Sequence, residues 1–197
     1  MVSVADNLFY FNGSSYLTIN DKTTLTEDTD FTVDWWEYPT ATPGYGTVFD
    51  LSAASGGGYS SARFGYTTSS GAEAVGFYLS SNNTSWDIAA YTSCGTREIG
   101  KWKHRAFVRH GSTFYIFENG KLITTVSSSS LLGSSVETVY IGRHATNSSG
   151  YYTGYLCNFR IAKNAFWISE FSPPDRKLNY GNQYSQIENS YIKVPIQ

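Results

Sequence analysis

Short apolar segments alternate with turns rich in Gly, Ser and Asn along most of the chain. This spacing, without a helical period, is typical of an all-β sandwich. About a dozen strands are expected, at 8–11, 16–19, 31–38, 47–51, 63–66, 74–79, 85–91, 102–109, 113–118, 121–126, 137–142 and 152–161. Residues 92–101 are expected to form a loop, and residues 165–171 a single helical turn.

The strongest local signal lies within residues 102–126. Asn119-Gly120 joins two apolar segments, and because both residues tolerate positive φ the pair predicts a tight hairpin. Side chains alternate along a strand, so residues 113–118 present apolar groups to both faces and predict a central strand covered on both sides. A polar, basic face is expected on the preceding strand, formed by Lys101, Lys103, Arg105 and Arg109.

Composition narrows the function classes. Aromatic residues make up 17% of the 197 residues and charged residues only 15%, which suits a sheet protein and argues against disorder. The net charge of −2 provides no broad positive field for nucleic acid, and no apolar run reaches the length of a membrane span. The N-terminal segment lacks the basic and apolar regions of a Sec signal, which predicts either a virion protein or a fragment of a longer chain.

Two cysteines, Cys94 and Cys157, lie far apart in the sequence. A single disulfide is an alternative, but we favour two thiols, and we expect Cys157 to point inward as a small hydrophobe. Aromatic residues at strand period are interpreted as core, including Trp35, Trp36 and Trp102.

Several motifs, in order, resemble the concanavalin A-like, laminin-G-like sandwich family. They are Phe11-Asn12-Gly13, Phe31-Thr32-Val33-Asp34-Trp35-Trp36, Trp102-Lys103-His104, Asn119-Gly120-Lys121, Gly154-Tyr155-Leu156 with Phe159-Arg160-Ile161, and Phe171-Ser172-Pro173-Pro174. The resemblance implies a two-sheet antiparallel jelly roll over residues 1–174, with the first strand near the last. The remaining residues, 175–197, are expected to pack on the domain or on a neighbour. The Phe171-Ser172-Pro173-Pro174 ending resembles copies of this domain in phage and marine bacterial proteins.

Catalytic chemistry is not predicted. Glucanases that share this fold carry two or three acidic residues on one strand face, and the nearest candidates here are Asp34 and Glu37. These lie three residues apart, so they should point to opposite faces. The histidines His104, His110 and His144 show no spacing for zinc or for a nucleophilic site, and His110 and His144 are expected to be solvated. Relatives hold Ca²⁺ in rim loops, which makes Asp50 and Asp87 the candidate calcium ligands, and no other cofactor is expected.

Glycan binding is the preferred interpretation. Sugars stack their CH faces on aromatic rings and direct hydroxyls to amide, carboxylate or guanidinium groups, so loop aromatics beside such groups are the expected composition. The candidate ligand-binding residues are Tyr45, Tyr59, Trp86, Asp87, Arg143, Asn147, Tyr151 and Tyr152.

We therefore predict a non-catalytic, lectin-like carbohydrate-binding module on a phage or other virion surface, or on an extracellular surface. One alternative is a purely structural virion protein that binds other virion proteins. A second is a glucanase-type hydrolase. A homo-oligomer formed through an edge strand or through residues 175–197 is a further expectation left open by the sequence. Neither nucleic acid nor membrane insertion is expected.

Overall fold

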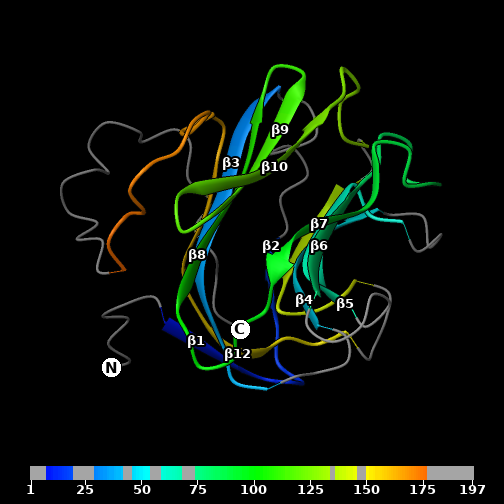
Figure 1. Ribbon diagram of the computed structural model, residues 1–197. Helices are drawn as coiled ribbons and strands as arrows, with labels where there is room; N and C mark the ends of the chain where they lie inside the picture. Colours follow the sequence, from blue (N-terminus) through cyan, green and yellow to red (C-terminus); the bar gives the residue numbers. More distant parts are fainter. Residues whose placement is uncertain are drawn as a thin grey trace.

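A computed structural model describes residues 8–19, 29–41, 46–53, 59–67, 74–133, 136–145 and 150–176. Within these residues the chain forms twelve strands and no helix (Figure 1). The strands are β1 (Leu8–Asn12), β2 (Leu17–Ile19), β3 (Asp30–Pro39), β4 (Gly46–Ala53), β5 (Ala62–Thr67), β6 (Ala74–Leu79), β7 (Ala89–Thr96), β8 (Lys103–His110), β9 (Thr113–Glu118), β10 (Lys121–Ser127), β11 (Val136–Ile141) and β12 (Thr153–Ala162).

Two six-stranded antiparallel sheets pack face to face, which confirms the predicted sandwich (Figure 1). Sheet A has the strand order β1-β12-β3-β8-β9-β10, and sheet B has the order β2-β11-β4-β5-β6-β7. The first and last strands pair along their length, with Tyr10 opposite Tyr155, as expected. Consecutive strands β4 to β7 form a meander in sheet B, while β11 and β2 complete that sheet from distant parts of the sequence.

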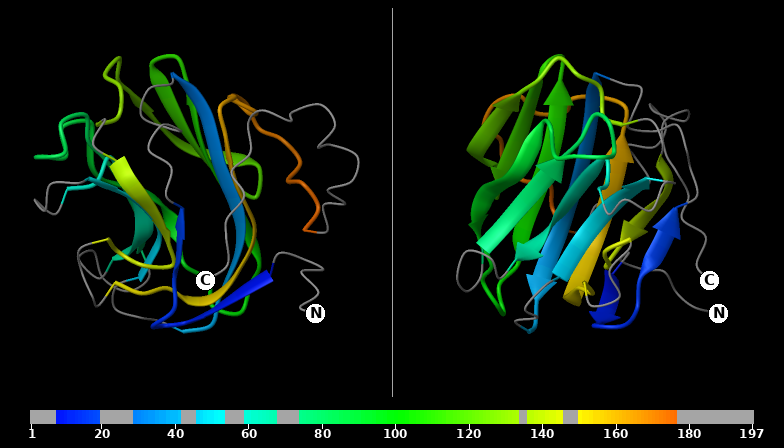
Figure 2. Two further views of the ribbon diagram at one scale, coloured as in Figure 1. Left: turned by 180° about the vertical axis from the view of Figure 1, so that it is seen from behind. Right: turned by 90° about the vertical axis from the view of Figure 1, so that its right-hand side faces the viewer.

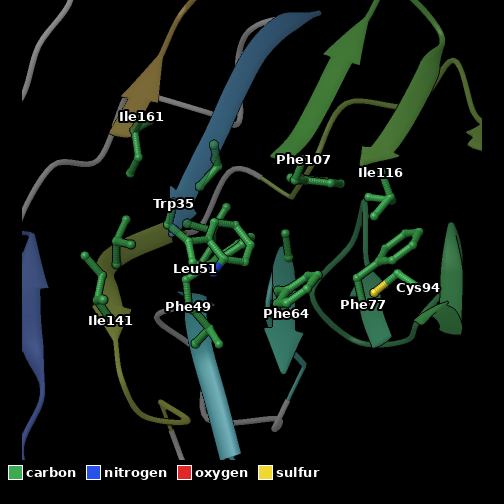
Figure 3. Packing of buried hydrophobic residues seen from close by; sticks show 14 of the residues in the cluster. Trp35, Phe49, Leu51, Phe64, Phe77, Cys94, Phe107, Ile116, Ile141 and Ile161 are labelled. Carbon is green, nitrogen blue, oxygen red and sulfur yellow. The ribbon is translucent and has the colours of Figure 1, made fainter. Parts of the chain in front are cut away.

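The core between the sheets is filled by alternate side chains of both layers (Figure 3). Trp35 of sheet A lies 4.7 Å from Phe64 and 5.5 Å from Phe49 of sheet B, ring centre to ring centre and nearly edge to face. Phe107 of β8 contacts Phe49 and Phe77 across the same layer. This packing fixes which residues of sheet B point away from the core.

The central hairpins form as predicted. Asn119 and Gly120 both have positive φ, 49° and 77°, at the tight turn between β9 and β10. Phe114 and Ile116 enter the main core, whereas Phe117 lies in a second apolar cluster on the opposite face of sheet A. Strand β9 is therefore covered on both sides, as its sequence indicated.

The second cluster is closed by residues 163–176, which run along the outer face of sheet A and are orange in Figure 1. Trp167 and Phe171 stack at 4.0 Å between ring centres and pack against the residues of β8 and β9 that face away from the core. The Phe171 N–H donates to the Gly120 carbonyl at 3.0 Å, and Trp36 Nε1 donates to the Pro174 carbonyl at 3.1 Å. The Phe171-Pro174 motif is thus a cover for sheet A. The helical turn predicted at residues 165–171 is wrong, since the segment is extended and irregular.

Several expectations about burial are corrected by this arrangement. Because residues 163–176 cover one side of β8 and sheet B covers the other, Lys103, Arg105 and Arg109 are buried and form no exposed basic face. Strand β7 occupies Ala89–Thr96, so the strand predicted at 85–91 begins later, and the predicted loop at 92–101 contains more than half of β7. Trp36 and Trp102 are only partly buried on the outer side of sheet A, away from the central core.

Cys94 and Cys157 are both buried thiols, as favoured. Cys94 belongs to the core between the sheets, where burial raises the pKa of its thiol to about 12. Cys157 is buried as well, but it follows the core residue Leu156 on β12 and so points to the outer face of sheet A. The described residues include no helix with the length and apolarity of a membrane span.

Candidate functional site

The outer face of sheet B carries a row of polar and aromatic side chains. The strands of that sheet face the viewer in the right-hand view of Figure 2. Register places Tyr140 of β11 opposite Asp50 of β4, Asp50 opposite Arg63 of β5, and Arg63 opposite Tyr78 of β6. Their neighbours along each strand are core residues, so side-chain alternation directs this row away from the core. The row forms the centre of the candidate site.

One end of the row is an aromatic cluster around Arg63. The Trp86 ring lies 5.2 Å from that of Tyr59 and 5.1 Å from that of Tyr78, centre to centre. The Arg63 guanidinium sits 5.0 Å from the centre of the Trp86 ring and 5.9 Å from that of Tyr78. The Arg63 Nη2 also donates to Ser60 Oγ at 2.9 Å. The three rings are partly exposed, so this end presents aromatic groups to solvent beside a buried cation.

Tyr91 supports this cluster from β7. Its φ is 55°, which is strained for a bulky residue inside a strand, and the β6–β7 register shifts on both sides of the Gly76–Ser93 pair beside it. The ring rests on Gly76, where a Cβ atom would come within 2.3 Å of Tyr91 Cε2. Glycine at position 76 therefore makes room for the Tyr91 ring, which contacts Tyr78 at 5.7 Å.

The other end of the row is a second aromatic cluster around Arg143. The guanidinium lies 4.6 Å from the ring centre of Tyr16, 5.0 Å from that of Tyr140 and 5.7 Å from that of Tyr151. Its Nε and Nη2 donate to the carbonyls of His144 and Ala145, each at 3.0 Å. An antiparallel bridge between Arg143 and Tyr151 brings the two loop segments together. Like the first cluster, this end combines half-exposed rings with a cation held in place by oxygen acceptors.

Asp50 connects the two aromatic clusters, because its buried carboxylate contacts groups that belong to both. Its side chain is fully buried, and its Oδ2 accepts hydrogen bonds from Arg63 Nε at 3.1 Å and from the Ala145 N–H at 3.0 Å. The Oδ1 atom is buried and accepts no hydrogen bond from the part of the chain that the structure describes. One carboxylate thus positions both the Arg63 cation and the loop that carries Arg143.

His144 lies beside this carboxylate, with its Nδ1 3.7 Å from Asp50 Oδ2. The expectation that His144 is solvated is wrong, because only 5% of the residue is exposed. Burial is the main cause that lowers the pKa of His144 to about 4. The positive charge of the nearby Arg63 lowers this pKa as well, and its effect is larger than the opposite effect of Asp50. The imidazole is therefore neutral in the folded protein near pH 7.

This depressed pKa predicts a loss of stability in mild acid. The unfolded histidine has a pKa of about 6.5, so between pH 6.5 and 4 the unfolded state binds more protons than the folded state. Stability from this group is complete above about pH 6.5 and falls as the pH drops toward 4, by at most about 3 kcal/mol. Urea denaturation across this range should show a steeper decline for the wild type than for His144→Gln. Parallel pH profiles would contradict the assignment.

Apart from Asp87, the predicted ligand residues divide into three groups. Tyr59, Trp86, Arg143 and Tyr151 lie on the outer face of sheet B and belong to the two clusters. Tyr152 does not, because it is 1% exposed and packs in the core against Phe11 and Tyr66. Tyr45 and Asn147 lie outside the described residues.

Asp87 organises the turn that carries Trp86. Its Oδ1 accepts from the Ser81 N–H at 2.9 Å and from Ser80 Oγ at 3.3 Å, and its Oδ2 accepts from Ser81 Oγ. Burial disfavours the charged carboxylate, but these hydrogen bonds outweigh it and hold the pKa of Asp87 below its usual value. Asp87 therefore supports Trp86 through the backbone of the turn.

The two candidate calcium ligands do not fit a cation. Asp87 is occupied by hydroxyl and N–H donors, and Asp50 faces the Arg63 guanidinium, whose charge opposes a second cation. Among the described residues no group of three or more His, Cys, Asp or Glu side chains is arranged to hold a metal.

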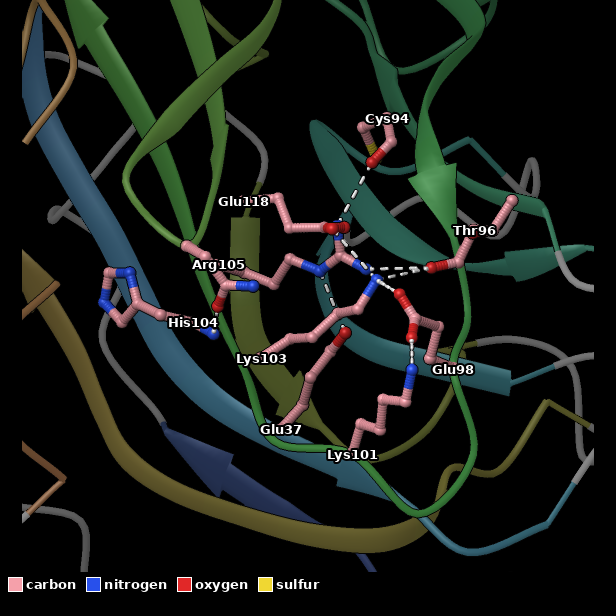
Figure 4. A network of polar contacts seen from close by, with 10 residues as sticks. Glu37, Cys94, Thr96, Glu98, Lys101, Lys103, His104, Arg105 and Glu118 are labelled. Atoms are coloured by element: carbon pink, nitrogen blue, oxygen red, sulfur yellow. Dashed lines mark hydrogen bonds and ion pairs between the residues drawn. The ribbon is translucent and has the colours of Figure 1, made fainter.

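The acidic residues that a glucanase would need are engaged elsewhere. Asp34 and Glu37 point to opposite faces of sheet A, as their spacing predicted. Asp34 accepts a two-point contact from Arg160 at 2.7 and 3.0 Å, and His104 Nε2 lies 3.2 Å from it. Glu37 is buried between the sheets, bonded to Arg105 Nε at 2.9 Å (Figure 4). Both carboxylates therefore form buried ion pairs that belong to the fold.

Sequence reasoning missed Tyr16, Tyr78 and Tyr140. Each lies in a predicted strand, whereas the predicted ligand residues are aromatic and polar residues in or beside loops. Period-two alternation could have identified Tyr78 and Tyr140, since each has core-type residues on both sides in the sequence. Their meeting on one face depends on the β11-β4-β5-β6 order, which does not follow the sequence.

Comparison with solved structures places this fold among jelly-roll domains. A heptameric SAP-like pentraxin from Limulus polyphemus is 19% identical and superposes with a TM-score of 0.62, covering 85% of this chain and 80% of its own. The CBM40 of a Ruminococcus gnavus IT-sialidase, bound to α2,3-sialyllactose, is 11% identical with a TM-score of 0.60, covering 81% and 91%. Domain 4 of AbnA, a GH43 extracellular arabinanase from Geobacillus stearothermophilus in complex with arabinotriose, is 15% identical with a TM-score of 0.58, covering 79% and 70%.

No curated protein sequence matches the chain. A family profile does match, and it spans residues 11–169, which is most of the sandwich and the first half of the segment that covers sheet A. On that match, the chain belongs to the concanavalin A-like lectin/glucanases superfamily.

Proposed function

We propose that this domain is a non-catalytic carbohydrate-binding module that binds glycan on the outer face of sheet B. The observation that carries the proposal is the cross-strand row that joins two partly exposed aromatic clusters through Asp50 and Arg63. Rings at both ends offer stacking surfaces for sugar CH groups, and the polar groups between them offer partners for hydroxyls. The similarity to sialyllactose- and arabinotriose-bound modules supports the same class of ligand.

The geometry is that of a preformed site. Both guanidinium groups are held by fixed oxygen acceptors, and the rings pack on them, so little side-chain freedom remains to be lost when a ligand binds.

The test is a glycan array that includes sialylated, arabinan and β-glucan oligosaccharides, probed with the wild type and with Trp86→Ala. Removal of the Trp86 ring is expected to weaken the best interaction by about tenfold or more, because stacked aromatic anchors dominate such interfaces. Ile168→Ala, at a 51% exposed position on the segment that covers sheet A, is the matched control and should bind normally. Equal binding by Trp86→Ala, with its fold intact, would rule out this face.

The setting proposed for this activity is a virion or another extracellular surface. The support is the resemblance of Phe171-Ser172-Pro173-Pro174 to the endings of phage and marine bacterial copies of the domain. In this setting the sandwich would present sheet B toward a host glycan. Co-sedimentation with purified particles, together with glycan binding, would support this placement, whereas particle association without glycan binding would favour the purely structural alternative.

A further inference from the structure

A second row of aromatic side chains crosses the outer face of sheet A, on the opposite side of the sandwich. Tyr10 of β1 pairs with Tyr155 of β12, which pairs with Tyr38 of β3. Trp102, immediately before β8, continues the row beside Tyr38. The successive ring centres are 4.9, 6.1 and 5.3 Å apart. We name these four residues the sheet A ladder.

The ladder points outward and is accessible. Its members alternate along their strands with residues that face the core, such as Leu156 and the buried Glu37. Tyr10 is 56% exposed, and the other three rings are partly exposed. Residues 163–176 cover the neighbouring part of the sheet, and Arg176 reaches the end of the ladder, where its guanidinium lies 4.8 Å from the Trp102 ring centre.

A polar row runs beside the ladder on the same face. One alternation step along each strand from Tyr10, Tyr155 and Tyr38 lie Asn12, Thr153 and Thr40. Asn12 and Thr40 are exposed, and Thr153 is partly exposed. Hydroxyl and amide groups thus border the rings along their length. Strand β1 is at the edge of sheet A, so among the described residues no further strand continues the row past Tyr10, and a long ligand can extend in that direction.

This combination matches an extended polysaccharide better than a protein partner. The ring spacing follows the repeat between neighbouring strands, and that repeat is close to the length of one sugar unit in an extended chain. A single file of rings with a polar border suits a narrow, hydroxylated ligand, whereas protein interfaces bury a wider apolar patch.

We propose that the sheet A ladder is a second carbohydrate-binding surface, which takes a linear β-linked polysaccharide along Tyr10, Tyr155, Tyr38 and Trp102. It rests on observations separate from those on sheet B. With sites on both outer faces, one domain can contact two polysaccharide chains and join them, and multivalent attachment raises avidity without any new contact.

The test is isothermal titration with glucose, cellobiose, cellotetraose, cellohexaose and xylohexaose, using the Trp86→Ala variant so that the sheet B face is impaired. Affinity is expected to rise with chain length up to about the tetrasaccharide, as one ring engages each sugar unit. Tyr10→Ala combined with Tyr155→Ala should weaken hexasaccharide binding at least tenfold. Leu8→Ala, at a 51% exposed position on the same strand and face, is the matched control and should bind normally.

Three results would overturn the proposal: no binding of any hexasaccharide by Trp86→Ala, binding without dependence on chain length, or unchanged binding after the double Tyr10/Tyr155 substitution. Thermal unfolding of each variant confirms that the fold persists. If the double variant loses nothing while Trp86→Ala loses array binding, the second surface is refuted and the sheet B proposal stands. If the ladder binds the hexasaccharide and array binding is unchanged in Trp86→Ala, the sheet B proposal is refuted and the second surface stands.

Discussion

Replacing Arg105 with leucine is expected to lower the free energy of unfolding by about 3–5 kcal/mol, because it leaves the buried Glu37 carboxylate without its cation. Arg105 is 1% exposed and lies between the sheets (Figure 4). Its Nε donates to Glu37 at 2.9 Å, its Nη1 donates to Glu118, and Nη1 also donates to the Cys94 carbonyl at 3.1 Å. Burial alone would lower the pKa of Arg105, but Glu37 and its other anionic neighbours raise it, so the charge is permanent.

The measurement is urea denaturation at pH 7 with far-ultraviolet circular dichroism. Lys101→Met is the matched control, since the Lys101 side chain is 68% exposed and pairs with Glu98 at the surface, where ion pairs contribute little. Arg105→Leu combined with Glu37→Leu should recover part of the loss, because one buried carboxylate is removed with the cation. A loss below about 1 kcal/mol in Arg105→Leu would show that Arg105 does not hold this end of the sandwich together.

Asp50→Ala is expected to cost about 3 kcal/mol and also to abolish glycan binding on sheet B. The substitution leaves the buried Arg63 guanidinium without its carboxylate and the Ala145 N–H without its acceptor. Both aromatic clusters depend on these contacts, since Arg63 lies under Trp86 and the loop at Ala145 anchors Arg143. Stability and glycan binding should therefore fall together in Asp50→Ala. In Trp86→Ala, by contrast, glycan binding should fall far more than stability.

Chemical denaturation and array binding of the same preparation test this coupling. Asp30→Asn provides the control, because Asp30 is a half-exposed carboxylate at the start of β3 in sheet A, where it pairs with His110. An Asp50→Ala protein that is folded, less stable and still binds glycan like the wild type would show that Asp50 serves the fold alone.

The positions of the strands were predictable because local sequence patterns determine them. The Asn119-Gly120 turn and the alternation of Phe114 and Ile116 with Tyr115 and Phe117 fix β9 and its hairpin without reference to the rest of the chain. By contrast, Arg105 and Arg109 alternate with Ala106 and Val108, a pattern that normally separates solvent from core. Here both faces of β8 are covered, so alternate side chains enter two different buried clusters. This covering arises from the tertiary structure and leaves no local signal in the sequence.

The candidate site was predicted in part for the same reason. Loop aromatics such as Trp86 and Tyr151 could be identified from their polar neighbours in the sequence. The strand residues that join them could not, because Tyr140, Asp50 and Arg63 become neighbours only through pairing between distant strands. The burial of His144 likewise arises from the approach of its loop to Asp50, a contact across 94 positions that leaves no local signal.

Glycan is expected to contact the outer face of sheet B, and the indole N–H signals of the five tryptophans report where that contact lies. Titration of ¹⁵N-labelled protein with the strongest array ligand should shift the Trp86 signal in a saturable manner. The Trp35 signal, whose indole is buried and bonded to Glu37 at 3.0 Å, should stay in place. A Trp86 signal that remains unchanged while the ligand binds would contradict the account.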